Sequence, residues 1–199
     1  MLEDVINKEE LALWPEDSVP EKARACTCCE LCSQRTRMIW GEGNPRGMVI
    51  VILDNPGSRE NKDGQPFVCG TRQTLMNAAA LAGFRQNDLY VTYVLKCRPK
   101  RKYDKAAALS ACMVHLEQQL NHHRYAAAFC LGDRATKTFF GDPNISVKES
   151  RNQMFHIRGL STFVSYHPLA VRRRPNLYPY FIDDWKTVFN FVTGSMHNQ

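Results

Sequence analysis

The sequence predicts a single α/β domain, a three-layer α/β/α sandwich in which a central, mainly parallel four-stranded sheet lies between helices. Short β-branched runs alternate with longer stretches of helical composition, a pattern typical of a parallel sheet covered on both faces. The 199 residues are 44% hydrophobic and 23% charged, which is enough apolar material for one core. No linker or internal repeat divides the chain. We therefore expect one domain over residues 1–199, with an N-terminal helical extension over 1–22 and a core over 23–195.

Four strands and four helices are expected in alternation. The run 48–53 is apolar, β-branched and bounded by Gly47 and by Asn55-Pro56-Gly57, so it is predicted to be a buried parallel strand. Gly83 marks the end of the helix that follows, as a C-cap. The remaining strands are expected over 89–95, 125–131 and 161–166, and the helices over 71–82, 105–121, 133–140 and 180–192.

The carboxyl ends of the predicted strands indicate where a ligand would bind. In open parallel sheets, ligands bind beyond these ends. Asp54 and Asn55 follow the first strand, 93–98 closes the second, and His167 follows the fourth. The sequence therefore predicts a site where these segments converge.

The chain shows no sign of export or membrane insertion. No run of about 18 uninterrupted apolar residues is present, and the acidic N-terminus lacks the apolar core of a signal peptide. We expect a cytoplasmic protein without disulfide bonds, because the cytosol keeps thiols reduced. Of the eight cysteines, Cys69 and Cys130 are predicted to be buried as small apolar residues.

The formal net charge of +6 is concentrated in two short basic blocks. One spans 96–105 and the other comprises Arg172, Arg173 and Arg174. Such blocks in loops suit contacts to phosphates, and they are equally compatible with a solvated surface that aids solubility.

Four of the cysteines lie within seven residues. Cys26 and Cys29 form one C-x-x-C pair, and Cys29 and Cys32 form another. Cys97 and Cys112 would complete a set of four thiolates if the fold brings them near, although a cysteine inside a helix is also an ordinary core residue. Thiolates suit zinc or iron–sulfur centres, and spacing alone leaves both open.

Several motifs occur in a fixed order between residues 23 and 192. They are Cys26-x-x-Cys29-x-Leu31, Arg35-Thr36, Gly41-Glu42-Gly43, Asn55-Pro56-Gly57, Asp63-Gly64-Gln65-Pro66-Phe67-Val68, Lys96-Cys97-Arg98-Pro99, Cys112, Leu131-Gly132 and His167-Pro168 followed by Arg172. In this order the set resembles the iron–sulfur (family 4 type) uracil-DNA glycosylases. The resemblance implies a monomeric enzyme that binds DNA, extrudes a nucleotide and hydrolyses its N-glycosidic bond. DNA as substrate further implies a location at the nucleoid.

The resemblance also implies a cofactor. The family cysteines that match Cys26, Cys29, Cys97 and Cys112 bind a [4Fe–4S] cluster. Cys28 and Cys32 match no family position, and the pair Cys29/Cys32 is a geometric substitute for Cys26/Cys29.

Roles for site residues follow in the same way. His167 matches the histidine that hydrogen-bonds a carbonyl oxygen of the departing base, and Phe67 matches the aromatic residue that stacks on the extruded base. Arg172 matches an arginine of the loop that engages DNA. Phosphate contacts are expected from the basic residues near these motifs, namely Lys96, Arg98, Arg173 and Arg174.

The chain departs from the family pattern at two places. Where members read Gly-Glu-x-Pro-Gly, this chain reads Leu53-Asp54-Asn55-Pro56-Gly57. Asn55 also resembles the Asn-Pro-Gly of mismatch-specific relatives, so we assign it to orienting the attacking water. Asp54 either supports catalysis or forms a turn.

The second departure affects base recognition. Members carry asparagine after the strand threonine, whereas Thr92 is followed here by Tyr93. A phenol cannot reproduce the paired donor and acceptor of an amide, so a changed base preference is expected. The alternatives are a glycosylase acting on modified bases of phage DNA, a DNA-binding iron–sulfur protein without excision, and a zinc-binding Cys₄ protein.

Overall fold

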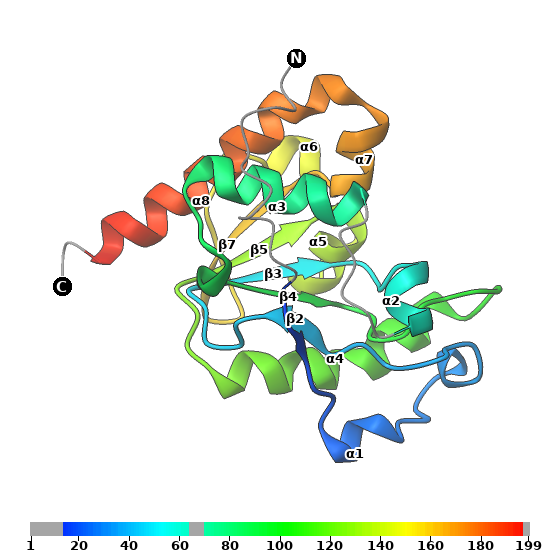
Figure 1. Cartoon of the computed structure of the whole chain (residues 1–199). Coiled ribbons are helices and arrows are strands. Elements are labelled where there is room, and N and C mark those ends of the chain that lie inside the picture. Colours follow the sequence, from blue (N-terminus) through cyan, green and yellow to red (C-terminus); the bar gives the residue numbers. More distant parts are fainter. Residues whose placement is uncertain (1–13, 64–69, 197–199) are drawn as a thin grey trace.

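A seven-stranded sheet forms the centre of the protein in the computed structural model, which describes residues 14–63 and 70–196 (Figure 1). The strands are β1 (Glu16–Asp17), β2 (Gly41–Gly43), β3 (Val49–Leu53), β4 (Leu89–Tyr93), β5 (Ala127–Leu131), β6 (Phe155–Ile157) and β7 (Leu160–Ser165). Their spatial order is β1-β2-β4-β3-β5-β7-β6. The four central strands are parallel, as expected, and β1, β2 and β6 add antiparallel pairs at the two edges. The expected count of four strands is thus correct for the parallel centre and too low for the whole sheet.

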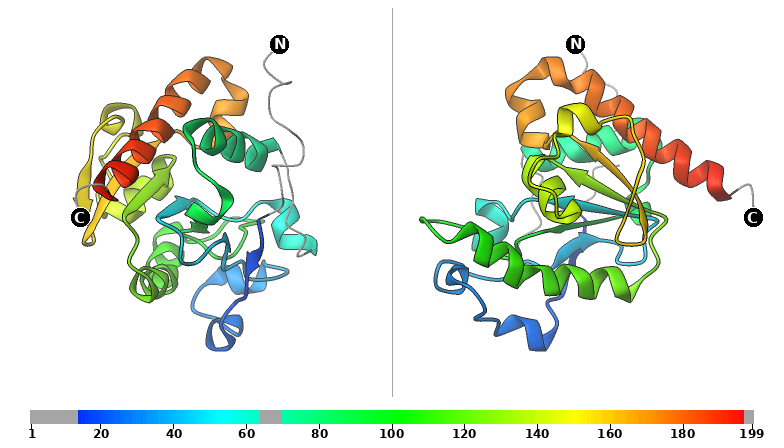
Figure 2. Two further views of the ribbon diagram at one scale, coloured as in Figure 1. Left: turned by 60° about the vertical axis from the view of Figure 1, so that its left-hand side comes forward. Right: turned by 180° about the vertical axis from the view of Figure 1, so that it is seen from behind.

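Helices cover both faces of the sheet (Figure 2). They are α1 (Glu21–Arg24), α2 (Ser58–Asp63), α3 (Gly70–Ala82), α4 (Lys105–His122), α5 (Asp133–Phe140), α6 (Val147–Ser150), α7 (Pro168–Arg173) and α8 (Tyr178–Met196), with 3-10 turns at Glu30–Ser33, Gln86–Asp88 and Pro175–Leu177. The four long helices and four parallel strands all lie within a few residues of their expected bounds. The three-layer α/β/α architecture is confirmed.

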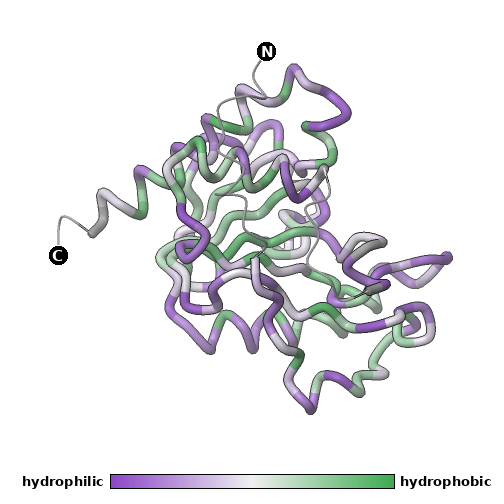
Figure 3. The backbone as a smooth tube through the Cα atoms, viewed as in Figure 1, coloured by the Kyte–Doolittle hydropathy of each residue, from purple (hydrophilic) through white to green (hydrophobic). Residues whose placement is uncertain are grey.

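Alternation along β3 separates the core into two halves. Val49, Val51 and Leu53 face a cluster formed with α3 and α8, whereas Ile50 and Ile52 face a cluster formed with α4 and α5. Successive side chains of a strand point to opposite faces, so a strand buried on both faces needs the continuous apolar run seen here. Figure 3 shows this as a hydrophobic centre with hydrophilic outer loops.

The expected helical extension over 1–22 is described only from residue 14, and this part contains the strand β1 and the start of α1 at Glu21. Residues 1–13 lie outside the described residues, and Glu16–Asp17 forms β1 at the sheet edge. Two acidic residues carry no strand signal, and their pairing depends on β2, a neighbour distant in sequence. Charged residues are common on edge strands because they discourage pairing with other chains.

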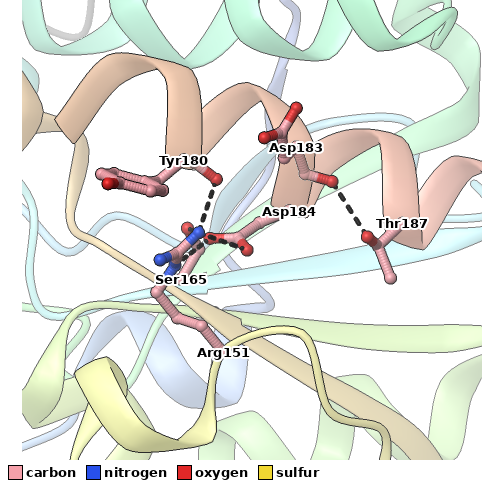
Figure 4. A network of polar contacts seen from close by, with 6 residues as sticks. All are labelled: Arg151, Ser165, Tyr180, Asp183, Asp184 and Thr187. Carbon is pink, nitrogen blue, oxygen red and sulfur yellow. Dashed lines mark hydrogen bonds and ion pairs between the residues drawn. The ribbon is translucent and has the colours of Figure 1, made fainter.

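A buried polar network fixes the end of β7 against α8 (Figure 4). The Arg151 guanidinium donates to both carboxylate oxygens of Asp184, at 2.6 and 2.9 Å, and to the Tyr180 carbonyl at 2.8 Å. The Ser165 hydroxyl also donates to Asp184. Ser165 is the last residue of β7 and lies two residues before His167, so the network helps to hold the segment that carries this histidine.

Among the described residues, no helix combines the length and apolar character that crossing a membrane requires.

Candidate active site

A cavity of about 310 Å³ opens at the carboxyl edge of the sheet. Its walls come from the ends of β3 and β4, from α2 and α3, and from the start of α7, and they include Asn55, Glu60, Arg72, Tyr93 and Leu169. Both α2 and α7 lie on the side toward which the β3 arrow points in Figure 1. The volume is within the range of small-molecule sites. The expected convergence of segments at this edge is therefore present.

His167 lies at the N-terminal end of α7 and directly precedes Pro168 and Leu169, which line this cavity. Its Nδ1 accepts a hydrogen bond of 3.1 Å from the Leu169 N–H, and Pro168 occupies the first helical position. Because Nδ1 acts as the acceptor, the neutral ring carries its proton on Nε2. Burial holds the pKa of His167 below its ordinary value; the Asp54 carboxylate opposes this, while Arg134 and Arg72 add to it. The imidazole is thus a neutral hydrogen-bond donor at neutral pH.

Gly132 makes room for His167. Its φ is +97°, a region that side-chain-bearing residues rarely adopt. A Cβ on Gly132 would lie 2.9 Å from the Cβ of His167. The Leu131-Gly132 motif therefore serves the close approach of β5 to the histidine.

Asp54 and Asn55 face different neighbours. Asp54 Oδ1 accepts a 3.0 Å hydrogen bond from the Ala135 N–H and so caps the first turn of α5. Asn55 lines the cavity; its Nδ2 donates to the Pro56 carbonyl at 2.9 Å, and its Oδ1 lies 3.5 Å from Nη1 of Arg134. One oxygen of Asp54 thus has a structural role, whereas within the described part of the chain Asn55 Oδ1 has only this long contact.

Tyr93 is buried at the cavity wall with its hydroxyl in polar contacts. The hydroxyl accepts from Arg72 Nη2 at 3.0 Å and donates to Glu42 Oε1 at 3.1 Å. Arg72 and Glu42 also form a buried ion pair with each other. The single proton of the phenol is therefore directed at Glu42 and not into the cavity.

Arg72 and Glu60 are cavity residues that the sequence did not single out. Arg72 Nη1 and Glu60 Oε2 are buried and have no hydrogen-bond partner within the part of the chain that the structure describes. The available signal was an arginine on the otherwise apolar side of α3 that faces the sheet. The sequence places Glu42 in the Gly41-Glu42-Gly43 motif but does not indicate its contact with Arg72.

The expected base-stacking residue Phe67 lies outside the described residues, as does Cys69. Cys130 is fully buried in the sheet, which confirms its expected role in the core.

Four arginines of the expected DNA-binding set are accessible at the same edge. Arg172, Arg173 and Arg174 are exposed at the end of α7, and Arg98 is half-buried in the hydrophilic loop between β4 and α4, where its Nη1 lies 3.1 Å from Ser58 Oγ (Figure 3). Their guanidinium groups are available to phosphates without rearrangement of the core.

Lys96 does not belong to this set, and its expected role in DNA binding is wrong. The residue is fully buried, with Nζ 2.5 Å from both Thr92 Oγ1 and Gln119 Oε1 and 5.5 Å from the centre of the Trp40 ring. Burial lowers the pKa of Lys96 to about 7. The lysine is therefore an interior polar link between β4 and α4.

The four candidate ligand cysteines gather around one small apolar cluster. Cys97 and Cys112 are buried within it, and Cys26 and Cys29 pack against it. Cys97 Sγ lies 3.3 Å from Arg35 Nη1, and Cys112 Sγ accepts from the Lys96 N–H at 3.2 Å. Burial raises the pKa of both thiols, an effect that Arg35 opposes at Cys97.

The donor set is suited to an iron–sulfur cluster. Among the described residues, no three cysteine, histidine or carboxylate side chains are close enough to hold a single metal ion. Tetrahedral zinc needs sulfurs only about 3.8 Å apart, given a Zn–S distance of about 2.3 Å, whereas a four-iron cluster separates its thiolates further. Apolar surroundings and N–H groups directed at sulfur are also features of such clusters. Cys28 is exposed and Cys32 half-buried.

Fold and site together define a three-layer α/β/α protein with a largely apolar cavity at the carboxyl edge of its sheet and arginines around it. Comparison with known proteins then gives the family: the sequence profile of the Uracil DNA glycosylase superfamily matches residues 40–189. The chain belongs to this superfamily.

The resemblance to family 4 is confirmed by individual relatives. The chain is 27% identical over 180 residues to the type-4 uracil-DNA glycosylase of Archaeoglobus fulgidus, covering 86% of this chain and 90% of that enzyme. It is 29% identical over 161 residues to that of Thermotoga maritima, covering 79% and 84%, respectively. With the Saccharolobus solfataricus enzyme it shares 28% over 200 residues, covering 90% and 92%.

Proposed function

We propose that this protein is a monofunctional DNA glycosylase that extrudes a uracil-like or modified pyrimidine and hydrolyses its N-glycosidic bond, leaving an abasic site. The observation that carries the proposal is the cavity at the ends of β3 and β4, which Asn55 lines and beside which His167 lies. The names of the type-4 relatives support the same reaction.

The chemistry requires stabilisation of a departing base. Water attacks C1′ of the sugar, the C1′–N bond breaks, and its electron pair leaves with the base, which becomes an anion. His167 Nε2–H would donate to a carbonyl oxygen where this negative charge develops. A preorganised neutral donor, as burial and the Leu169 contact favour here, stabilises that charge without a proton transfer.

Asn55 and Asp54 would serve the sugar side of the reaction. Asn55 Oδ1 can accept a hydrogen bond from the attacking water and so orient its lone pair toward C1′. The proton that the water loses passes through solvent to the departed base anion. Asp54 keeps its α5 contact through Oδ1, while its negative charge favours the cationic character of the sugar in the transition state.

The arginines would hold the DNA. Arg98, which contacts the cavity residue Ser58, and the three arginines at the end of α7, Arg172, Arg173 and Arg174, are suited to phosphates flanking the extruded nucleotide. Such contacts position the duplex and carry no sequence information.

We propose that Cys26, Cys29, Cys97 and Cys112 hold a [4Fe–4S] cluster. When bound, the cluster supplies a covalent link between the N-terminal segment, the end of the β4 segment and α4. Arg98 follows Cys97 directly, so this link would stiffen the loop that contacts DNA. Cys28 and Cys32 remain the substitute ligands.

The activity is tested by single-turnover assays on duplex and single-stranded oligonucleotides that contain uracil, hypoxanthine, 5-hydroxymethyluracil or modified cytosines. We expect alkali-labile sites with at least one of these bases. The rate for His167→Ala should be lower than that of the wild type by about 100-fold or more. Absence of cleavage across the panel, by protein that still binds DNA, would instead support a binding protein without excision. The observation behind this second candidate is that the Tyr93 hydroxyl contacts Arg72 and Glu42, so this residue does not read the base edge as the family asparagine would.

A further inference from the structure

The cavity contains hydrogen-bonding groups that the proposed mechanism does not use. Arg72 is only 6% exposed, and its Nη2 is occupied by Glu42 and Tyr93. Its Nη1 is buried without a hydrogen-bond partner among the described residues. A buried donor without a partner is unfavourable in the free protein, so a ligand that supplies an acceptor gains affinity.

Glu60 presents the complementary group from α2. Its Oε2 is also buried and without a partner in the described part of the chain, and the residue lines the same cavity as Arg72. A guanidinium can only donate, and an ionised carboxylate can only accept. Two residues that line the cavity thus carry one unused donor and one unused acceptor, both buried in its wall.

We propose that Arg72 determines base specificity by donating to a ring carbonyl oxygen, and that Glu60 accepts from the adjacent ring N–H. The inference rests on the proposed function in that the base must enter this cavity. The substrate class is then a base with a –CO–NH– edge, such as uracil or hypoxanthine. In cytosine and adenine the ring nitrogen is unprotonated, so the bond to Glu60 is lost whichever adjacent group Arg72 contacts. On the amino side of these bases the acceptor that Arg72 needs is also replaced by a donor, which leaves both buried groups unpaired.

Tyr93 and Glu42 are positioning residues in this scheme. The phenol oxygen and the Glu42 carboxylate hold Nη2 of the guanidinium, which leaves the buried Nη1 as the nitrogen without a partner among the described residues. Tyr93 therefore acts on the base through Arg72. Arg72 does not distinguish uracil from thymine, since these bases differ at C5 and not at a carbonyl.

The test combines protein and substrate changes. Arg72→Gln is made together with Glu42→Gln, so that no buried carboxylate is left unpaired, and Glu42→Gln alone is the matched control. The substrates are duplexes with uracil, 2-thiouracil, 4-thiouracil or cytosine, because sulfur is a weaker acceptor than oxygen. Excision rates and affinities are both measured, the latter on 2′-fluoro nucleotides, whose fluorine disfavours the cationic sugar and slows hydrolysis.

We expect the double variant to excise uracil roughly 10- to 100-fold more slowly than Glu42→Gln. For each thio substitution, the excision rate with uracil is divided by the rate with the thiouracil, and this ratio is compared between the double variant and Glu42→Gln. For one of the two thiouracils the ratio should fall by about fivefold or more in the double variant, and for the other it should stay the same. Glu60→Gln should slow uracil excision and leave both thio effects intact. A general loss of folded protein lowers the rates on uracil and on thiouracil equally, so it does not change the ratio between them.

Each outcome separates the two proposals. Excision without any coupling between Arg72 and either sulfur overturns the role of Arg72, as does equal excision of cytosine and uracil by the wild type. Coupling in affinity without excision of any base leaves the role of Arg72 standing and overturns the glycosylase function.

Discussion

At the scale of single residues, His167 shows how the backbone sets the chemistry of a side chain. The Leu169 N–H occupies Nδ1, and burial disfavours the charged ring, so the imidazole is kept neutral with a proton on Nε2. Protonation at Nδ1 would break the Leu169 contact. The histidine is therefore suited to donating a hydrogen bond and poorly suited to acting as a general acid.

This predicts the pH dependence of excision. The pKa of His167 is lowered, so the neutral, active form persists as the pH falls through about 6.5, the ordinary value for histidine. We expect the single-turnover rate to bend downward only below that pH. The bend should be absent from the residual rate of His167→Ala. If the rate of the wild type bends downward above pH 6.5 and that of His167→Ala does not, the pKa of His167 is raised and the prediction is wrong.

A second residue-scale prediction separates Lys96 from the surface arginines. Because Lys96 is buried between Thr92, Gln119 and Trp40, Lys96→Met should leave DNA affinity within about twofold of the wild type. Arg98→Ala should weaken binding to all sequences and lower the slope of log affinity against log salt by about 1. Fluorescence anisotropy across a salt series measures both. A lower slope for Lys96→Met would contradict the buried placement.

Lys96 also marks a limit of prediction from sequence. Its neighbours along the chain include Arg98, Lys100, Arg101 and Lys102, so composition assigns it to a basic surface. Its burial depends on Gln119 from α4 and Trp40 from the segment before β2. Such contacts between distant segments leave no local pattern.

At the scale of elements, the parallel strands and long helices were predictable and the short elements were not. The run that forms β3 is apolar at every position and β-branched at all but Leu53, which specifies a buried strand locally. The strands β1 and β2 are two and three residues long and consist of acidic residues and glycine. They exist because β4 offers a free edge, so only the tertiary structure specifies them.

The helix α5 supports a prediction with a built-in control. It is flanked by Gly132 and Gly141, both with positive φ, but only Gly132 contacts His167. Alanine at either site should destabilise the protein by about 1–3 kcal/mol through backbone strain. Gly132→Ala should in addition slow base excision, because its Cβ displaces the histidine. Denaturant unfolding and single-turnover rates measure the two effects. Equal rates for the two variants would argue against the contact with His167 being functional.

At the scale of the whole molecule, the sequence indicated where the site lies but not which side chains contact one another within it. The edge that collects Asn55 and His167 follows from strand direction alone. In contrast, the contact among Glu42, Arg72 and Tyr93 joins residues 21 to 51 positions apart on β2, α3 and β4. The changed residue Tyr93 was visible in the sequence, whereas its engagement by Arg72 required the fold.

The cluster can be tested on the intact protein. We expect anaerobically purified wild type to be brown, with absorbance near roughly 400 nm. Cys97→Ser and Cys112→Ser should lose this colour and much of their thermal stability. Cys130→Ala is the matched control, since this buried cysteine lies in the sheet core and should leave the colour intact. Bleaching by Cys32→Ser but not by Cys26→Ser would identify the substitute pair. A colourless wild type containing zinc would contradict the cluster.

The account depends on an extruded base occupying the cavity between α2, α3 and α7. A crystal structure of the protein with a duplex that contains 2′-fluoro-2′-deoxyuridine tests this most directly. We predict the uracil ring inside the cavity, a carbonyl oxygen within hydrogen-bond distance of His167 Nε2, and the second carbonyl near Arg72 Nη1. A uracil that stays stacked in the duplex, or that lies outside this cavity while the DNA is bound, would contradict it.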